Sequence, residues 1–387
     1  MSLRRWLRGF AWICVLPMVP LAIPAIAGAA GDLVYVGTYT GHGSQGIYAF
    51  RFDPAGGGSV SLGLAAETEN PSFLAVDPKG RFLYAVNETG AFQGQPTGTI
   101  SVFGIDRGTG RLDLRQQVAS LGRDPAHLSL DKTGRYLLVA NYSGGNIAVF
   151  PIGGDGRLGP RSAFVQHAGS SVNPERQAGP HPHSIQVTPG NRSVLVTDLG
   201  LDKLLVYRFD AKKGSLTPDE PGSVRLDPGA GPRHIAFAPS GKFVYAVNEM
   251  ASTVAVFAYD PGPGTLVRKQ TVPTLPEGYP GKNTAAEIAV DAKGRFLYAS
   301  NRGDDSIVVF GIDAGSGTLT LVERVPSGGR TPRHFVIDPT GAWLFAANQG
   351  SDNIQMFKID PASGRLTATS GALKVVAPVC VLVVPAR

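Results

Sequence analysis

The stretch PRHIAFAPSGKFVYAVNE, residues 232–249, contains a pattern that recurs along the chain. Apolar residues alternate with small or polar residues on both sides of a short turn, which is typical of two antiparallel strands joined as a hairpin. A further alternating run follows, TVAVFAYD at 253–260, and a weaker fourth run comes after it. The pattern therefore predicts a unit of four short strands. Five further full copies begin at Pro71, Pro125, Pro182, Ala285 and Pro332.

The spacing and number of these units predict the fold class. Successive copies start 47–57 residues apart, and four-stranded units at such a spacing are typical of β-propeller blades. Residues 33–53 match only the second and third strands of the unit, and residues 377–385 match only the first. We therefore predict an all-β, seven-bladed β-propeller with four antiparallel strands per blade, closed by N- and C-terminal strands that share one blade. A β-helix would require shorter repeats.

The first thirty residues differ from the rest of the chain. Three arginines precede an apolar run, Phe10–Ile26, and small residues follow it. This order is that of a secretory signal, with cleavage expected after Ala29 or Ala30. We expect residues 1–30 to be a signal peptide, residues 31–387 to be a single propeller domain, and the mature protein to be periplasmic or extracellular. Three prolines in the apolar run disfavour the alternative of a retained membrane helix, so no stable membrane insertion is expected after cleavage.

Charge and cysteine content argue against a nucleic-acid-binding protein and against a fold held together by disulfides. The formal net charge is +6 at pH 7, and the basic residues are scattered rather than clustered. A nucleic-acid partner is therefore not indicated. Cys14 lies in the predicted signal and Cys380 near the C-terminus, so the mature chain can form no internal disulfide. We expect a monomer that depends on its own packing for stability.

Two positions of each unit are expected to meet at one mouth of the central channel. The first strand of a blade lines the channel and pairs antiparallel with the second, so the start of the first lies beside the end of the second. Most units carry proline at the first of these places and Asn at the second. The adjoining positions carry charged or imidazole side chains that each occur in one unit: His183, Arg233, Glu287, Arg333, Glu249 and Arg302. Such a cluster predicts a polar, anion-binding pocket, with a ring of inter-blade salt bridges as the alternative.

Other polar positions of the repeat are expected to be structural. The Asn at the end of the second strand can hydrogen-bond the backbone of the turn that follows. His127, His234 and His334 come one position after the expected pocket residues. Strict alternation directs their side chains the other way, toward packing or hydrogen bonding between blades. In this scheme His183 lines the mouth and His181 lies on the loop above it.

Specific motifs carry a resemblance to a known family. They are VYVGTYT (34–40), NPERQAGPHPHSIQ with VTDLGLDKLLVY (173–207), GAGPRHIAFAPSGKFVYAVNE (229–249), AAEIAVDAKGRFLYASNR (285–302) and TPRHFVIDPTGAWLFAANQ (331–349). Along essentially its whole mature length the chain resembles the seven-bladed propeller lactonases, namely the 6-phosphogluconolactonase type and the related 3-carboxymuconate lactonizing enzymes. The resemblance implies the propeller fold and lactone chemistry without a metal or other cofactor. Members are usually cytoplasmic, whereas this chain carries a predicted export signal.

The resemblance also implies a catalytic set of one histidine, two arginines and one glutamate. Through the motifs these fall on His183, Arg233, Arg302 and Glu249. Hydrolysis of a sugar-acid lactone, a small-molecule substrate, would use Glu249 and His183 as base and acid, in either order. Arg233 and Arg302 would stabilise the oxyanion or hold a carboxylate or phosphate. The further expected substrate contacts are Arg333, Arg176, His181, Asn248 and Glu287.

Three alternative functions remain open at the level of sequence. The first is a lactonizing or cycloisomerase reaction on a muconate-type diacid with the same acid and base. The second is a non-catalytic exported propeller that binds polysaccharide or protein. The third is a metal-dependent lactonase, with calcium held by oxygens of Glu249, Glu287, Glu88 and Asn248. The sequence contains no HExxH, CxxC or nucleophile-elbow motif.

Overall fold

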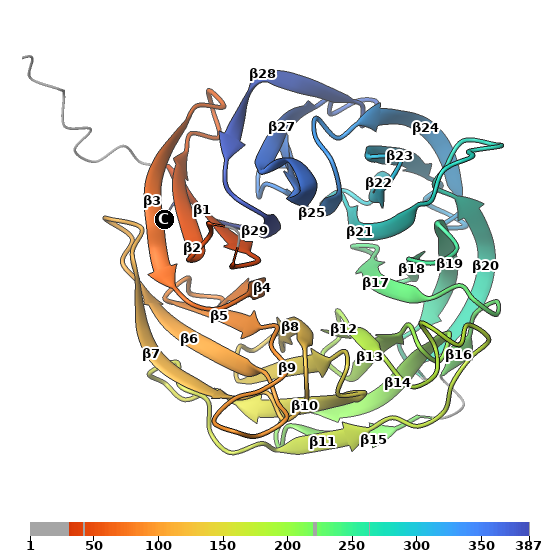
Figure 1. Cartoon of the computed structure of the whole chain (residues 1–387). Helices are drawn as coiled ribbons and strands as arrows, with labels where there is room; N and C mark the ends of the chain where they lie inside the picture. Colours follow the sequence, from red (N-terminus) through yellow and green to blue (C-terminus); the bar gives the residue numbers. More distant parts are fainter. Residues whose placement is uncertain (1–30, 42, 220–222, 263, 387) are drawn as a thin grey trace, which may run out of the picture. The chain divides into compact units, whose positions relative to one another are not determined.

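The computed structural model describes residues 31–41, 43–219, 223–262 and 264–386. The predicted signal peptide lies outside these described residues. Seven antiparallel sheets stand in a ring around a central channel (Figure 1), which confirms the predicted seven-bladed β-propeller. The described part of the chain contains no helix that is long and apolar enough to cross a bilayer.

Six of the blades follow the chain from their inner to their outer strand. The strands of the first three are β4 (Pro71–Val76), β5 (Phe82–Asn87), β6 (Thr99–Ile105), β7 (Leu112–Ala119), β8 (Pro125–Leu130), β9 (Tyr136–Asn141), β10 (Asn146–Pro151), β11 (Ala163–Gln166), β12 (Pro182–Val187), β13 (Ser193–Asp198), β14 (Lys203–Asp210) and β15 (Ser215–Pro218), with β16 (Val224–Arg225) also paired to β14.

The strands of the next three blades are β17 (Pro232–Phe237), β18 (Phe243–Asn248), β19 (Thr253–Asp260), β20 (Thr265–Pro273), β21 (Thr284–Val290), β22 (Phe296–Arg302), β23 (Ser306–Ile312), β24 (Leu319–Pro326), β25 (Pro332–Ile337), β26 (Trp343–Asn348), β27 (Asn353–Ile359) and β28 (Leu366–Lys374). A short 3-10 turn, η2 (Gln349–Ser351), joins β26 to β27.

The seventh blade joins the two ends of the chain, as the sequence predicted. Across the sheet its strands are β29 (Pro378–Val384), β1 (Asp32–Thr38), β2 (Gly46–Phe52) and β3 (Ser59–Glu67). The inner strand β29 pairs antiparallel with β1, with Val36 opposite Val381 and Leu33 opposite Val384. Cys380 in β29 is buried and forms no disulfide. Closure therefore rests on strand pairing and packing, which also removes the open sheet edge that β1 would otherwise present.

Buried tyrosines on the second strands connect neighbouring blades. Tyr84 donates a hydroxyl hydrogen bond to the Gly156 carbonyl of the next blade at 3.0 Å, and Tyr245 does so to Gly317 at 3.1 Å. Tyr298 makes the same kind of contact. The two glycines have φ angles of 85° and 74°, which favour glycine because it lacks a Cβ. Each of these glycine turns thus joins two strands of its own blade and also accepts the hydrogen bond that ties the preceding blade to it.

The Asn at the end of the second strand has the predicted structural role, but its partner differs from the one expected. Asn141 donates its side-chain amide to the Ser120 carbonyl at 2.9 Å, and Asn301 donates to the Thr274 carbonyl at 3.1 Å. Asn348 makes the equivalent bond. The acceptors lie in the connection that enters the same blade, not in the turn that follows the Asn. These three Asn side chains therefore fix the points at which their inner strands begin.

A β-bulge at the start of the inner strands changes the direction of side chains near the channel mouth. In β8, β12, β17 and β25 the pairing register shifts within two residues after the starting proline, which breaks the alternation. The prediction that His127, His234 and His334 point away from the channel was therefore wrong, because the His127 and His234 rings meet at a centroid distance of 5.3 Å. The predicted inter-blade hydrogen bonds are present: the Ile185 N–H lies 3.4 Å from His127 Nδ1, and the Val381 N–H lies 3.2 Å from His334 Nδ1.

Candidate active site

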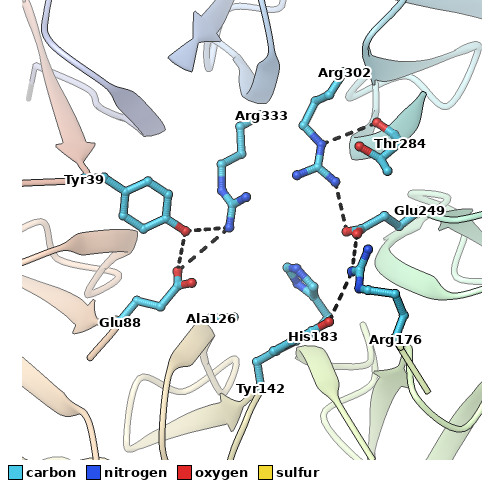
Figure 2. A pocket seen from close by; sticks show the side chains of 10 residues that line it. All are labelled: Tyr39, Glu88, Ala126, Tyr142, Arg176, His183, Glu249, Thr284, Arg302 and Arg333. Carbon is cyan, nitrogen blue, oxygen red and sulfur yellow. Dashed lines mark hydrogen bonds and ion pairs between the residues drawn. The ribbon is translucent and has the colours of Figure 1, made fainter. Parts of the chain in front are cut away.

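A cavity of about 460 Å³ lies at the channel mouth, where the two predicted ring positions meet (Figure 2). Four lining residues directly follow the ends of second strands, Arg302 is the last residue of another second strand, and residues after the starting proline supply three more. Each of the seven blades contributes at least one side chain. The lining residues are Tyr39, Glu88, Ala126, Tyr142, Arg176, His183, Glu249, Thr284, Arg302 and Arg333.

Glu249, directly after β18, is surrounded by three arginines. Its Oε1 accepts a hydrogen bond from Arg176 Nη2 at 2.7 Å, and its Oε2 lies 2.9 Å from Arg302 Nη2. Arg233 Nε lies 3.2 Å from Oε2 as an ion pair, out of line for a hydrogen bond. Burial alone would raise the pKa of the Glu249 carboxyl, but the three arginines lower it to about 2. Glu249 is therefore ionised at neutral pH and carries the counter-charge of the three arginines.

Arg233, predicted to contact the substrate, lies behind Glu249 and does not line the cavity. Its side chain is only 3% exposed. Its Nη1 donates to the Ala286 carbonyl at 2.8 Å and lies 3.4 Å from His234 Nε2. Burial and two neighbouring guanidinium groups lower the pKa of Arg233 to about 9, so it remains charged at neutral pH. Its position allows it to balance the charge of Glu249 and to support the pocket from beneath.

Glu287, also predicted to contact the substrate, lies below the pocket lining. It is the second residue after the start of its unit, the place that histidine takes in other blades, and the irregular pairing of β21 places it in the channel. Its carboxylate lies 3.0 Å from His234 Nδ1 and 3.4 Å from His334 Nε2. Burial raises the pKa of Glu287 and lowers the pKa of both histidines. The carboxylate holds the His234 ring so that its Nε2 faces Arg233.

His183 lines the cavity from the bulge of β12, as predicted. Its ring makes edge contacts with Tyr142, at a centroid distance of 5.4 Å, and with His234 at 5.1 Å. Its Nδ1 is buried and makes no hydrogen bond within the described chain, which leaves Nε2 as the nitrogen that a ligand can reach. Burial, followed by the charge of Arg233, lowers the pKa of His183 well below 6.5. The imidazole is therefore uncharged at neutral pH.

Arg176 reaches the cavity from the long connection between β11 and β12. Its Nη2 contacts Glu249 and also donates to the Tyr142 hydroxyl at 3.2 Å, while 40% of its side chain is exposed. His181, predicted to contact the substrate, lies behind Tyr142 instead. The two rings stack at a centroid distance of 4.5 Å, and His181 Nδ1 lies 3.0 Å from the Tyr142 carbonyl oxygen. His181 therefore supports the pocket wall, and Arg176 is the most exposed of the pocket arginines.

Asp198 holds both ends of the connection that carries Arg176. His167 Nδ1, at its start, lies 2.6 Å from Asp198 Oδ2, and the His181 N–H, at its end, donates to Oδ1 at 2.8 Å. The Leu201 N–H donates to the same Oδ1 at 3.1 Å. Asp198 occupies the position at which five other units carry Asn. A carboxylate can accept all three hydrogen bonds, whereas an amide would turn an NH₂ group toward one of the donors.

The opposite wall of the cavity contains a chain of three polar side chains (Figure 2). Arg333 Nη2 donates to the Tyr39 hydroxyl at 2.7 Å, and that hydroxyl donates to Glu88 Oε2 at 2.8 Å. The guanidinium carbon of Arg333 lies 5.2 Å from the centre of the Tyr39 ring. Burial raises the pKa of the Tyr39 hydroxyl, so it remains a hydrogen-bond donor. These contacts fix the Arg333 guanidinium at the cavity surface.

Residues 33–383 match the family described as "Lactonase, 7-bladed beta-propeller". The chain belongs to this lactonase family. It is similar to the 6-phosphogluconolactonase of Bacillus subtilis (strain 168), with 39% identity over 299 residues that cover 77% of this chain and 83% of that protein. A 6-phosphogluconolactonase of Formosa agariphila is 33% identical over 306 residues, 78% of this chain and 85% of that one. The periplasmic gluconolactonase PpgL of Pseudomonas aeruginosa superposes with a TM-score of 0.86 at 39% identity, covering 92% of this chain and 99% of that one.

The lactonase pocket does not offer the calcium site that the sequence left open. Glu249 is already held by three arginines, and Glu287 lies beneath the lining. Asn248 does not line the cavity, because its amide turns to the Thr253 hydroxyl at 2.9 Å. The fourth expected ligand, Glu88, lies on the opposite wall (Figure 2). The four side chains therefore do not converge on one point, and Asn248, expected as a substrate contact, lies outside the cavity lining.

Some lining residues of the lactonase were not predicted from the sequence. Tyr39 and Tyr142 directly follow the ends of second strands, the same position as Glu249, and Glu88, which shares this position, was expected only as a calcium ligand. They adjoin the second of the two positions that were expected at the channel mouth, but a tyrosine at a strand end is equally expected to pack between blades. Thr284 carried no signal, because its unit lacks the proline that marks the start of the first strand.

Proposed function

We propose that this lactonase hydrolyses a sugar-acid lactone in the cavity at the channel mouth. One observation carries the proposal: the uncharged imidazole of His183 shares a cavity of about 460 Å³ with the guanidinium groups of Arg302 and Arg333. A cavity of this size suits a hexose-sized ligand. Lactone hydrolysis requires a proton acceptor and positive charge near the carbonyl oxygen. The names of similar proteins, 6-phosphogluconolactonase and gluconolactonase, support the same substrate class.

In the proposed reaction His183 is the general base. Water attacks the carbonyl carbon of the lactone while His183 Nε2 accepts one of the water protons. The carbonyl oxygen becomes negatively charged, and Arg302 and Arg333 stabilise it. The bond between the carbonyl carbon and the ring oxygen then breaks, and the proton passes from His183 to that oxygen to give the open sugar acid. The negative charge on the substrate offsets the repulsion between the arginines and the protonated imidazole.

Glu249 has a positioning role in this proposal. Its ionised carboxylate bonds Arg176 and Arg302 and pairs with the buried Arg233, so it fixes the direction of these guanidinium groups. Arg176 is exposed enough to meet a second charged group of the substrate. Arg176 and Arg333 would bind a substrate carboxylate or phosphate through charge-assisted hydrogen bonds.

The purified chain from Gly31 onward tests the proposal with glucono-δ-lactone and its 6-phosphate, followed by acid release. Arg302→Gln should lower kcat by about 10²-fold, because it removes a cation from the developing oxyanion. Arg115→Gln, on the outer strand β7, is the matched control and should keep full activity. Chelator should leave the activity intact. Absence of turnover with both lactones, or equal kcat for Arg302→Gln and the unmodified chain, would refute the proposal.

We further infer that the mature enzyme works outside the cytoplasm. The order of basic, apolar and small residues over residues 1–30 supports this inference, as does its similarity to a protein described as a periplasmic gluconolactonase. Cell fractionation with N-terminal sequencing tests it. The mature chain should begin at Ala30 or Gly31, and a cytosolic protein with its N-terminal arginines intact would contradict export.

A further inference from the structure

A second cavity, of about 590 Å³, adjoins the proposed active site. Tyr39 lines both cavities, with its hydroxyl bonded to Arg333 and Glu88 on the active-site side. The Tyr39 side chain is therefore a wall that the two cavities share, and the second cavity begins where the lining of the first ends. The other polar side chains that line the second cavity are Thr40, Asn70, Thr331, Gln349 and Asp352.

The lining of the second cavity differs chemically from that of the active site. Among the described residues, no basic side chain lines it, and Asp352 is its one charged side chain. The Asp352 Oδ1 accepts a hydrogen bond from the Ala377 N–H at 2.8 Å. A phosphate or carboxylate is less favoured here than in the active site, because the lining carries the Asp352 charge and no basic side chain. The nearby Arg330 guanidinium donates to the carbonyl of Gly350, a lining residue, at 2.8 Å. A neutral ligand rich in hydroxyl groups suits this lining.

Part of the lining is fixed and part is available for hydrogen bonding. The Thr40 N–H donates to Asn70 Oδ1 at 2.9 Å, and Asn70 Nδ2 donates to the Glu88 carbonyl at 3.3 Å. These bonds make a wall continuous with the active site. By contrast, the side-chain amide of Gln349 and the hydroxyl of Thr331 make no hydrogen bond within the described chain. Both groups donate and accept, as sugar hydroxyls do.

We propose that the second cavity is a subsite for an uncharged sugar unit attached to the lactone ring. The substrate class then includes lactones of disaccharide acids. This inference rests on the proposed function, because the lactone ring must occupy the cavity at His183 while the attached sugar lies beyond Tyr39. Water adds to the lactone carbonyl and the ester bond to the ring oxygen breaks, whereas the glycosidic bond between the sugars stays intact.

The test compares kcat/KM for glucono-δ-lactone and cellobiono-δ-lactone on the purified chain from Gly31 onward. Slightly acidic buffer limits spontaneous hydrolysis, and the uncatalysed rate is subtracted. The disaccharide lactone should show a kcat/KM about threefold to tenfold higher, mainly through a lower KM, as expected for one or two additional hydrogen bonds.

Two variants of Gln349 locate the effect. Gln349→Ala removes the unpaired amide, and Gln349→Trp fills part of the second cavity. Each should therefore lower the ratio of kcat/KM for the disaccharide lactone to kcat/KM for glucono-δ-lactone toward one. Gln117→Ala, on the exposed outer strand β7, is the matched control and should retain the preference. Thermal unfolding confirms that each variant is folded before the ratios are compared.

The outcomes separate the subsite from the reaction itself. Equal kcat/KM values for the two lactones would overturn the subsite and leave the proposed function standing. A preference that persists in both Gln349 variants would also overturn it, because the second sugar would then bind elsewhere. Turnover of neither lactone would instead remove the proposed function on which the subsite depends.

Discussion

At the scale of single residues, Glu249 organises most of the positive charge in the pocket. Its two carboxylate oxygens contact guanidinium groups from the connection before β12, from the inner strand β17 and from the end of β22. These segments lie far apart in the sequence. Glu249 was expected from sequence to be an acid or base, and in our proposal it instead positions the cations.

Glu249→Gln tests this role, because it removes the charge and keeps the size. Three guanidinium groups would then face each other without a counter-charge, so we expect the variant to lose about 3 kcal/mol of stability and most of its activity. The pKa of folded Glu249 is about 2, below its ordinary 4.5, so its contribution is present above pH 4.5 and lost as the pH falls toward 2. Urea unfolding should show a difference from the unmodified chain that shrinks in acid. A difference of constant size at every pH would contradict the role.

The low pKa of His183 leads to a prediction about how kcat/KM depends on pH. Its pKa is held well below 6.5, so the unprotonated base is present throughout the neutral range and is lost only in more acidic solution. We expect kcat/KM to stay constant as the pH falls through 6.5, and His183→Gln to lower kcat by about 10²-fold or more. A decline of kcat/KM centred near the ordinary histidine pKa would count against His183 as the base.

The sequence predicted which residues meet at the mouth but not how deeply each lies. His183, Glu249 and Arg302 line the cavity as expected. Arg233 and Glu287 were assigned to the same rim, yet both lie beneath it. Depth depends on the bulge and on the packing of side chains from other blades, and neither is encoded in the spacing of one unit.

At the scale of elements, the connection before β12 brings Arg176 to the pocket. This cation lies outside the strands of the repeating unit. Asp198→Asn should release this connection, because the amide would face donors at His167 or at the His181 N–H. We expect KM to rise severalfold for a phosphorylated lactone, with a smaller change in kcat, as Arg176 loses its fixed position. Steady-state kinetics on both lactones provide the measurement.

A double-mutant cycle shows whether Asp198 acts through Arg176. In an Arg176→Gln background, the additional effect of Asp198→Asn on KM should largely disappear, since the two residues belong to one network. Fully additive effects would mean that Asp198 stabilises the fold without positioning Arg176.

Strands were easier to predict than the contacts between them. Alternation and turn residues identified the hairpins, such as β17 and β18, because both signals are local. The bulge at the start of β17 inserts one residue into the pairing without any mark in composition. The hydrogen bond from Asn141 to Ser120 could not be assigned either, since the acceptor lies in a connection whose path depends on the preceding blade.

At the scale of the whole molecule, the ring was predictable because the two ends of the chain supply complementary parts of one blade. Residues 33–53 lacked a first strand and residues 377–385 supplied one, and β29 pairs with β1 as this complementarity required. The second cavity was not predictable, because its lining combines residues near the two ends of the chain, which meet only when the ring closes.

Removal of β29 tests how far stability depends on closure. A chain that ends at Ala377 should leave β1 with an unpaired edge. It should also expose apolar side chains that pack against β29, such as Val34 and Val36, which are fully buried in the closed ring. We expect this chain to aggregate or to unfold at a much lower temperature. A chain that lacks only residues 1–30 is the control and should unfold as the mature protein does. Unchanged thermal unfolding after loss of β29 would show that the ring does not need its closing strand.

Every blade presents at least one side chain to the same cavity while its own hairpins keep the common backbone. The enzyme can therefore change its ligand preference by a single codon in one blade, without altering the interfaces of the other six. Chimeras that exchange one complete blade between relatives should keep the toroid and transfer one element of specificity at a time.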